Sequence, residues 1–163
     1  MVKESSNIAV IGYSDVSLIR KVENLIESNH AVKILSVLDS YNALIESYDY
    51  YEDNGTLLED MFNKIVDLID TADALVIIIP SNTDNQYVNH KEFNAFLTGY
   101  AWSQGIPCIY YCDNLSDGSM FFFDIMAKSL QATLHGQDAL KEYDFVGLPL
   151  VAHKGYISNY MRH

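Results

Sequence analysis

Short apolar runs alternate along the chain with segments in which apolar residues recur every three or four positions. The short runs predict buried strands, and the longer period predicts helices that cover them. This alternation predicts an α/β domain whose mostly parallel sheet is covered on both faces. We expect five strands, which are Asn7–Gly12, Ala31–Leu38, Ala74–Pro80, Cys108–Cys112 and Leu130–Leu134.

Helices are expected between these strands. Ser14 or Asp15 can cap the first helix, whose apolar residues run from Val16 to Ile26 at helical spacing. The other predicted helices are Thr56–Asp70, Val88–Gln104, Met120–Lys128 and Gln137–Tyr143.

A polar, tyrosine-rich stretch from Asp39 to Gly55 is expected to be a long connection rather than a regular element. Compact folds keep such connections mainly for function or for contact with another chain. Its tyrosines leave three interpretations open: a subunit contact, stacking on the base of a bound ligand, or ordinary surface. They are Tyr41, Tyr48, Tyr50 and Tyr51.

The length of 163 residues predicts a single domain, residues 1–163. Acidic residues outnumber basic ones by 22 to 10, so a nucleic-acid backbone would be repelled and no nucleic-acid partner is expected. The longest apolar run, Ala74–Pro80, falls well short of the roughly 20 residues that span a bilayer. The N-terminus lacks the apolar core of a signal peptide. We therefore expect a cytoplasmic protein that does not enter a membrane.

Signals for a cofactor or a metal are weak. The turn after the first strand, Gly12–Asp15, carries neither a GxGxxG motif nor a phosphate-binding loop, so no cofactor is expected. The histidines are scattered without the spacing of metal ligands, and no metal site is predicted. Cys108 and Cys112 lie four positions apart on one strand, too far apart for a disulfide, and are predicted to be reduced thiols in the core.

The position of a pocket follows from the type of sheet. Ligands of open parallel sheets bind beyond the carboxyl ends of the strands, where the strand order reverses. The segments expected at that mouth are Gly12–Asp15, Asp39–Gly55, Ser81–Glu92 and Asp113–Met120.

Three segments resemble the nucleoside 2-deoxyribosyltransferases. They are IDTADALVIIIP, TGYAWSQGIPCIYY and KEYDFVGLP, and they follow a first strand that ends in glycine. From the first strand to the last of these segments, the resemblance extends over most of the chain in the order of that family. The resemblance implies a flavodoxin-like three-layer sandwich and a homo-oligomer whose pockets are completed by a neighbouring subunit. It also implies exchange of bases on a 2-deoxyribose through a covalent glycosyl-enzyme.

The same resemblance assigns the polar site residues of the family to positions that have lost those side chains. The nucleophilic carboxylate falls at Leu97, two residues before Gly99, and its acidic partner falls at Lys91. The aspartate near the base falls at Ile65, and the asparagine from the partner chain falls at Gly118. Burying an unpaired carboxylate is costly, so apolar residues stabilise a chain that is released from catalysis. No catalytic residue is therefore predicted.

The surroundings of Leu97 favour packing over chemistry. Leu97 shares one helical stripe with Phe93, Phe96, Tyr100 and Ala101, which predicts that this side of the helix is core.

The preferred hypothesis is a catalytically silent protein that keeps the fold and the oligomer interface and binds a nucleoside-like small ligand. Its candidate binding residues are Gly12, Tyr13, Asp15, Lys91 and Met120.

Two alternatives stay open. The first is an active deoxyribosyltransferase or nucleoside N-glycosidase that uses a relocated carboxylate from Glu92, Asp84 or Asp15. Glu92 is the fallback acid, although it lies about 100 to 140 degrees around the helix from Leu97 and needs a register shift to replace a nucleophile there. The second alternative is a structural partner of an active paralogue in a mixed oligomer.

Overall fold

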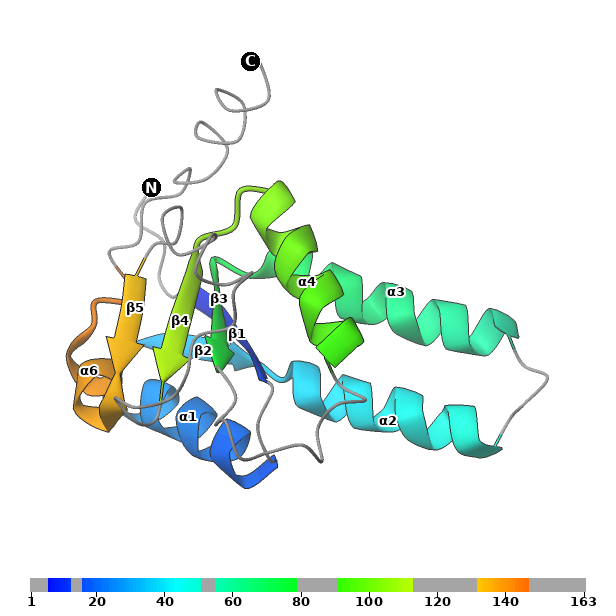
Figure 1. Ribbon diagram of the computed structural model, residues 1–163, viewed down its shortest axis with the longest axis horizontal. Helices are drawn as coiled ribbons and strands as arrows, with labels where there is room; N and C mark the ends of the chain where they lie inside the picture. The colour runs from blue at the N-terminus through cyan, green and yellow to red at the C-terminus, as the bar shows by residue number, and fades with distance from the viewer. Residues whose placement is uncertain (1–5, 13–15, 51–54, 79–90, 113–131, 147–163) are drawn as a thin grey trace, which may run out of the picture.

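The computed structural model describes residues 6–12, 16–50, 55–78, 91–112 and 132–146. These residues form five strands and five helices (Figure 1). The strands are β1 (Ser6–Gly12), β2 (Val32–Leu35), β3 (Ala74–Ile78), β4 (Cys108–Cys112) and β5 (Ala132–His135). The helices are α1 (Val16–Asn29), α2 (Val37–Tyr50), α3 (Gly55–Thr71), α4 (Lys91–Ser103) and α6 (Gly136–Glu142).

The strands form one all-parallel sheet in the order β2-β1-β3-β4-β5. This is the flavodoxin-like arrangement, so the predicted fold class is confirmed. The order reverses at β1, whose neighbours are β2 and β3. A ligand site is therefore expected beyond the carboxyl ends of these strands.

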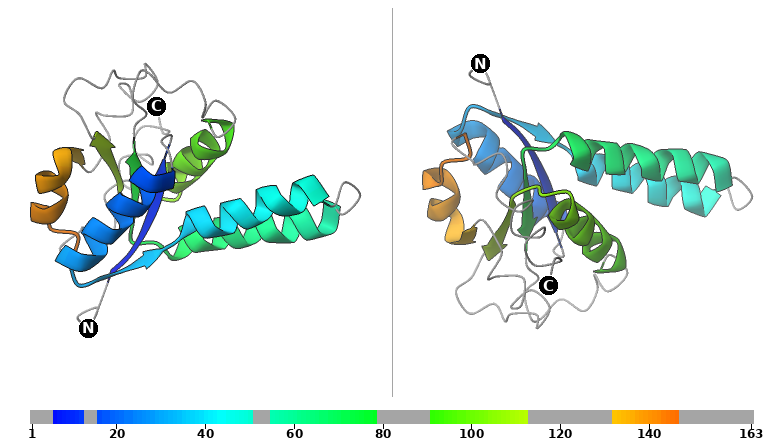
Figure 2. Two further views of the ribbon diagram at one scale, coloured as in Figure 1. Left: turned by 90° about the horizontal axis from the view of Figure 1, so that it is seen from below. Right: turned by 90° about the horizontal axis from the view of Figure 1, so that it is seen from above.

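Each face of the sheet carries its own hydrophobic cluster, because successive side chains of a strand point to opposite faces. Ala9 and Ile11 of β1 belong to the cluster under α3 and α4, whereas Ile8 and Val10 belong to the cluster under α1 and α6. The two layers of helices give the expected three-layer sandwich (Figure 2).

Helix α2 corrects two predictions. Strand β2 ends at Leu35 instead of Leu38, and the stretch expected as a long connection is mostly helical. The helix begins where Ser36 Oγ accepts a hydrogen bond from the Asp39 backbone N–H at 3.4 Å, the pattern of an N-cap. Val37, Tyr41 and Leu44 then recur at helical spacing, and no glycine or proline interrupts them. The acids and tyrosines between these apolar residues concealed the helical period in the sequence.

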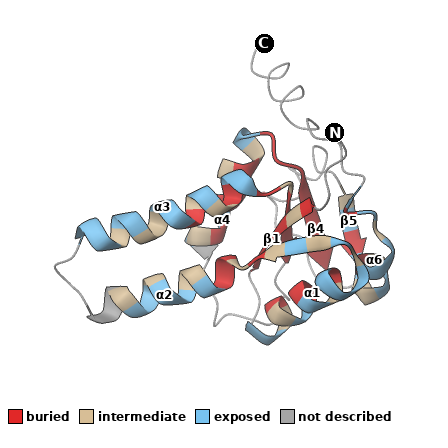
Figure 3. Cartoon of the chain, turned by 180° about the vertical axis from the view of Figure 1, so that it is seen from behind, coloured by how far each residue is buried: buried red, intermediate tan, exposed pale blue. Residues whose placement is uncertain are grey.

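Helices α2 and α3 pack side by side and project beyond the sheet (Figures 1 and 2). We call this pair the arm. Where side chains are described, no residue of α2 after Leu38 and none of α3 before Ile65 is buried (Figure 3). The inner ends of the two helices therefore belong to the core, and the outer parts do not.

The Gly-Ile-Pro segment forms the turn that follows α4. Gly105 has a φ of 76°, a conformation that side chains disfavour. Its N–H donates to Trp102 O at 3.2 Å, and the Ile106 N–H donates to Ala101 O at 3.0 Å. These two bonds form a Schellman motif, which ends α4 and directs the chain into β4.

The remaining boundaries agree with the sequence to within a few residues. Helix α4 is described from Lys91, and β5 ends at His135 rather than Leu134. The predicted helix Met120–Lys128 lies outside the described residues. No helix in the described part of the chain is long and apolar enough to cross a membrane.

Candidate functional site

A small pocket of about 60 Å³ lies beyond the carboxyl end of β1, at the position that the strand order predicts. Helices α1, α2 and α4 contribute the rest of its described lining. Most of that lining is apolar, with two asparagines as its polar side chains. The pocket residues used below are Gly12, Val16, Tyr41, Asn42, Phe93 and Asn94.

Asn94 ties α4 to the end of β1. Its Nδ2 donates to Gly12 O at 2.8 Å, and Thr98 Oγ1 donates to Asn94 O at 2.7 Å. Both side chains are buried, so these bonds satisfy polar groups that water does not reach. The Asn94 amide therefore has a structural role, because it holds α4 against the end of β1 at the pocket.

Gly12, a predicted binding residue, lines the pocket and also has a packing role. A Cβ at this position would lie 3.0 Å from Ile78 Cβ and 3.2 Å from Ile19 Cγ1. Real Cβ atoms rarely approach so closely, so the glycine lets β1 pass between β3 and α1. The close packing explains this glycine without a ligand.

An aromatic pair forms one wall of the pocket. The rings of Tyr41 and Phe93 stack with centroids 4.2 Å apart, joining α2 to α4. Burial raises the pKa of the Tyr41 hydroxyl above its usual range, so the phenol stays neutral at physiological pH. The wall thus offers an apolar surface and no charge. Tyr41 and Asn42 lie in the segment expected at the mouth of the pocket, and Tyr41 was considered for stacking on a base. Phe93 and Asn94 were not predicted as pocket residues, because they lie on α4 just beyond the expected segment Ser81–Glu92.

Two described apolar residues, to which the family resemblance assigns carboxylates, lie in the core. Ile65 of α3 and Leu97 of α4 are both 0 % exposed and belong to one hydrophobic cluster with Leu75 and Ile77 of β3. Neither residue lines the small pocket. Both side chains are enclosed among the described core residues, as the helical stripe of Leu97 predicts.

Within its described part, the structure does not bring the polar candidate residues together. Glu92, the fallback acid, is exposed on the first turn of α4 and is not among the described pocket lining. Lys91 begins α4, but its side chain is outside the described part of the structure. Five further candidates also lie outside the described residues, namely Tyr13, Asp15, Asp84, Gly118 and Met120.

One part of the predicted stripe on α4 is wrong. Ala101 is buried, and Phe93 and Tyr100 pack against the cluster, but Phe96 is 49 % exposed. The buried stripe instead runs through Asn94, Leu97, Thr98 and Ala101, rotated by about one residue. Two buried polar residues on that stripe hid its true direction.

Asp73, in the Thr-Ala-Asp segment of the family resemblance, has a structural role. Its carboxylate accepts a hydrogen bond from the Asn7 backbone N–H at 2.7 Å, and its own N–H donates to Asn7 O at 2.7 Å. This pair of bonds aligns the start of β3 with the start of β1.

A polar cluster joins α1 to the start of α2. Arg20 donates to the Asp39 carboxylate, to Ser36 Oγ at 3.1 Å and to Glu23 Oε1 at 3.2 Å. Glu23 is 4 % exposed, and its Oε2 has no hydrogen-bond partner among the described residues. Burial raises the pKa of the Glu23 carboxyl, while the hydrogen bond from Arg20 lowers the pKa of Asp39.

The cysteines have the environment expected of core thiols. Cys108 and Cys112 are both buried thiols of β4. Burial raises the pKa of the Cys108 thiol to about 12, so it is not a nucleophile at neutral pH. Within the described residues, no three His, Cys, Asp or Glu side chains are grouped to hold a metal ion.

Similarity to a solved enzyme extends over nearly the whole fold. A 2-deoxyribosyltransferase from the psychrotolerant bacterium Bacillus psychrosaccharolyticus superposes with a TM-score of 0.61, covering 88% of this chain and 96% of that one. The fold is deoxyribosyltransferase-like. Sequence identity between the two is 18%, so the similarity establishes the architecture and not the activity.

A second structure is more distant. A putative pilus assembly-related protein from Burkholderia pseudomallei aligns at 15% identity with a TM-score of 0.43, over 85% of this chain and 86% of that one. That similarity is too low to support any inference. No family model and no curated protein sequence matches the chain.

Proposed function

We propose that this chain is a catalytically silent protein of deoxyribosyltransferase fold. The observation that carries the proposal is the burial of Ile65 and Leu97, the positions that the family resemblance assigns to two carboxylates. A glycosyl-enzyme needs a carboxylate that reaches the anomeric carbon of a bound sugar. Two fully buried aliphatic side chains cannot supply that group.

The relocated-acid alternative has less support. Glu92 is the described candidate, and its side chain is exposed on the outer side of α4, away from Leu97. General acids and nucleophiles are usually held in environments that shift their pKa or fix their geometry. An exposed carboxylate on a helical first turn is not enclosed by side chains that would fix its geometry.

The pocket at the end of β1 supports a second part of the proposal, weak binding of a nucleoside-like ligand. Its apolar wall of Tyr41 and Phe93 suits the face of a nucleobase, and the Asn42 amide can donate and accept hydrogen bonds. Ligand pockets are typically about 300 to 1,000 Å³, and this one is about 60 Å³. It therefore admits only part of a nucleoside. The proposed protein is a homo-oligomer, as the family resemblance implies.

Binding is tested by titrating a 2′-deoxynucleoside into the protein and following its NMR spectrum. Asn42→Ala should weaken the interaction, because it removes the exposed amide of the pocket. Asn63→Ala is the matched control, since Asn63 is also exposed on a helix but does not line the pocket. Equal loss in both variants, or no spectral change in the wild-type protein, would contradict ligand binding. Catalytic silence is tested separately by an exchange assay described at the end of the Discussion.

A further inference from the structure

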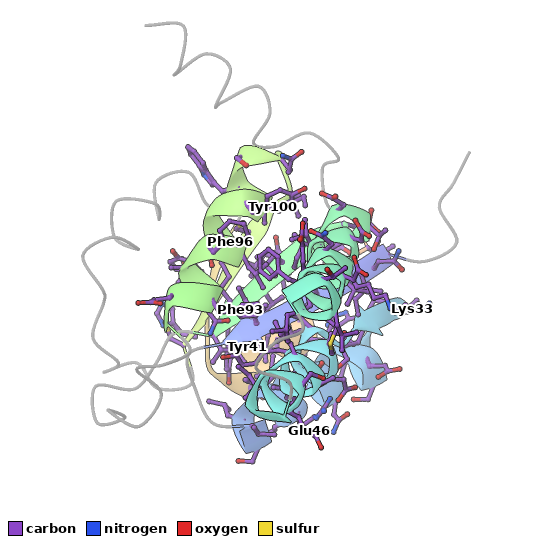
Figure 4. The ribbon with its side chains drawn as sticks, turned by 90° about the vertical axis from the view of Figure 1, so that its right-hand side faces the viewer. Lys33, Tyr41, Glu46, Phe93, Phe96 and Tyr100 are labelled. Carbon is purple, nitrogen blue, oxygen red and sulfur yellow. The ribbon has the colours of Figure 1, made fainter. Side chains whose placement is uncertain are left out.

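A row of aromatic side chains lies where the arm meets α4. It begins with the stacked pair Tyr41 and Phe93 and continues through edge and tilted contacts to Phe62, at 6.4 Å from Phe93 and 5.4 Å from Phe96. Tyr100 follows Phe96 at 6.3 Å. Figure 4 shows Phe93, Phe96 and Tyr100 in succession along the side of α4 next to the arm. We call these five residues the aromatic row.

The described residues leave part of the aromatic row uncovered. Phe96 is 49 % exposed, and the other four rings of the row are only partly buried. Elsewhere on the arm, Ile45 and Leu57 are 40 % and 37 % exposed. Exposed apolar side chains that form one patch commonly mark an interaction site. Because α4 already buries a different stripe against the sheet, Phe96 is not needed for the core.

The helices around this row carry mainly negative charge. Helix α2 carries three acidic residues and no basic one, α3 carries four acidic residues and one lysine, and α4 carries one of each. Helix α1, on the other face of the sheet, is balanced, with two basic and two acidic residues. The acidity is therefore concentrated on the elements that frame the aromatic row.

The row and its acids also interact directly. Tyr100 OH donates to Asp70 Oδ1 at 2.7 Å. This hydrogen bond, and the nearby charges of Asp70 and Asp67, raise the pKa of the Tyr100 hydroxyl. Aromatic faces and carboxylates in one place attract cationic side chains through cation–π and ionic contacts.

We propose that the aromatic row, between the arm and α4, is a docking surface for a basic amphipathic helix of another protein. Apolar side chains of such a helix cover Phe96 and its neighbours, while its lysines and arginines face the acidic helices. A second copy of this chain fits less well, because it would place acidic surface against acidic surface. The inference is independent of the catalytic state and of the small pocket.

The test uses a fluorescent synthetic peptide of leucine and lysine whose leucines occupy one face of a helix. A second peptide has the same composition in shuffled order and no apolar face. Fluorescence anisotropy should show saturable binding of the first peptide to the full-length protein, with much weaker binding of the second. Affinity should fall as salt is added, because charge contributes to the complex.

Two matched pairs of variants locate the contact. Phe96→Ser should weaken binding by about tenfold or more, as expected for loss of an aromatic anchor, and Val146→Ser should leave it within about twofold. Val146 is the matched control because it is also 49 % exposed and belongs to another part of the molecule. Glu46→Gln with Glu59→Gln on the arm should likewise weaken binding more than Glu27→Gln with Glu142→Gln on α1 and α6.

Several results would overturn the proposal. Equal affinity for both peptides would indicate simple charge attraction, and equal effects of Phe96→Ser and Val146→Ser would place the contact elsewhere. Absence of peptide binding would also contradict it. An oligomer that Phe96→Ser converts to monomers, without any binding of the peptide, would assign the surface to a second copy of this chain.

Discussion

Ile65 of α3 and Leu97 of α4 are fully buried in one hydrophobic cluster on a single face of the sheet. The family resemblance in the sequence assigns to these two positions the carboxylates that handle the sugar and the base. Two carboxylates in this cluster would need solvent, cations or hydrogen-bond donors around them. The described neighbours are aliphatic and aromatic instead. The burial of these two residues is therefore the structural basis of the proposed lack of transferase activity.

Restoring the carboxylate should disrupt this packing. We expect Leu97→Glu to lower the free energy of unfolding by more than Leu97→Ala, for which about 2 to 5 kcal/mol is typical at a buried leucine. The reason is that glutamate adds the cost of a buried charge to the loss of the leucine. Urea unfolding followed by circular dichroism measures both values.

Leu97→Met is the control for that comparison, because it conserves volume and should cost less than about 1.5 kcal/mol. A Leu97→Glu protein as stable as the wild type would mean that the position is open to water, and would remove the main support for catalytic silence.

Alanine substitutions at the glycines of the Gly-Tyr-Ala and Gly-Ile-Pro segments should change the stability of the protein in opposite directions. Gly99 lies within α4, and a Cβ there would meet nothing within 4 Å, so Gly99→Ala should raise stability by up to about 1 kcal/mol. Gly105 has a positive φ in the Schellman turn, so Gly105→Ala should lower stability by about 1 kcal/mol. Thermal unfolding of the two variants tests the pair. A destabilised Gly99→Ala protein would reveal a packing constraint that the described residues lack.

Gly12→Ala should be destabilising by about 1 to 3 kcal/mol, the usual range for overpacking. The added methyl group meets Ile78 Cβ, which sits on strand β3 and cannot rotate away. Gly55→Ala is the control, because a Cβ at Gly55 meets nothing within 4 Å. Urea denaturation should rank Gly12→Ala well below Gly55→Ala in stability. The reverse ranking would favour a functional reason for Gly12 over the steric one.

Glu23 and Asp39 should contribute opposite pH dependences. Burial raises the folded-state pKa of Glu23, so its contribution to stability is present below its unfolded pKa and is lost as pH rises. The wild type should therefore lose stability relative to Glu23→Gln as pH rises above about 4, the usual pKa of a glutamate. The hydrogen bond from Arg20 lowers the pKa of Asp39, so the contribution of Asp39 is present above its unfolded pKa and is lost on acidification.

The wild type should accordingly lose stability relative to Asp39→Asn as pH falls below about 4. Urea unfolding of the three proteins across this pH range separates the two effects. Stability differences that do not change with pH would show that neither carboxyl has a shifted pKa in the folded state.

The strands of the central sheet could be predicted because their apolar runs are short and rich in β-branched residues. Ala74–Ile78 is an example, buried at every position. Helix α2 was harder to recognise, although Val37, Tyr41 and Leu44 have helical spacing, because acids and tyrosines separate its apolar positions. Its outer part also packs against α3, a contact between elements that local sequence does not show.

The position of the candidate pocket could be predicted from the sequence, but most of the residues that line it could not. The rule for parallel sheets correctly identified the end of β1 as the mouth of a pocket. The pairing of Tyr41 with Phe93 joins residues distant in sequence and depends on how α2 and α4 approach each other. Phe96 was assigned to the core because buried Asn94 and Thr98 shift the true stripe by one position. Buried polar residues of this kind defeat a count of apolar positions.

The central claim is the absence of deoxyribosyl transfer, and one assay tests it most directly. The purified protein is incubated with a 2′-deoxynucleoside and a different free base, and chromatography follows both the exchanged nucleoside and the released base. A 2-deoxyribosyltransferase with known activity establishes the sensitivity of the assay. We predict no exchange and no hydrolysis above the buffer control, with Glu92→Gln identical to the wild type. Exchange or base release that depends on the protein would contradict the proposal, and its loss in Glu92→Gln would assign the reaction to the exposed acid of α4.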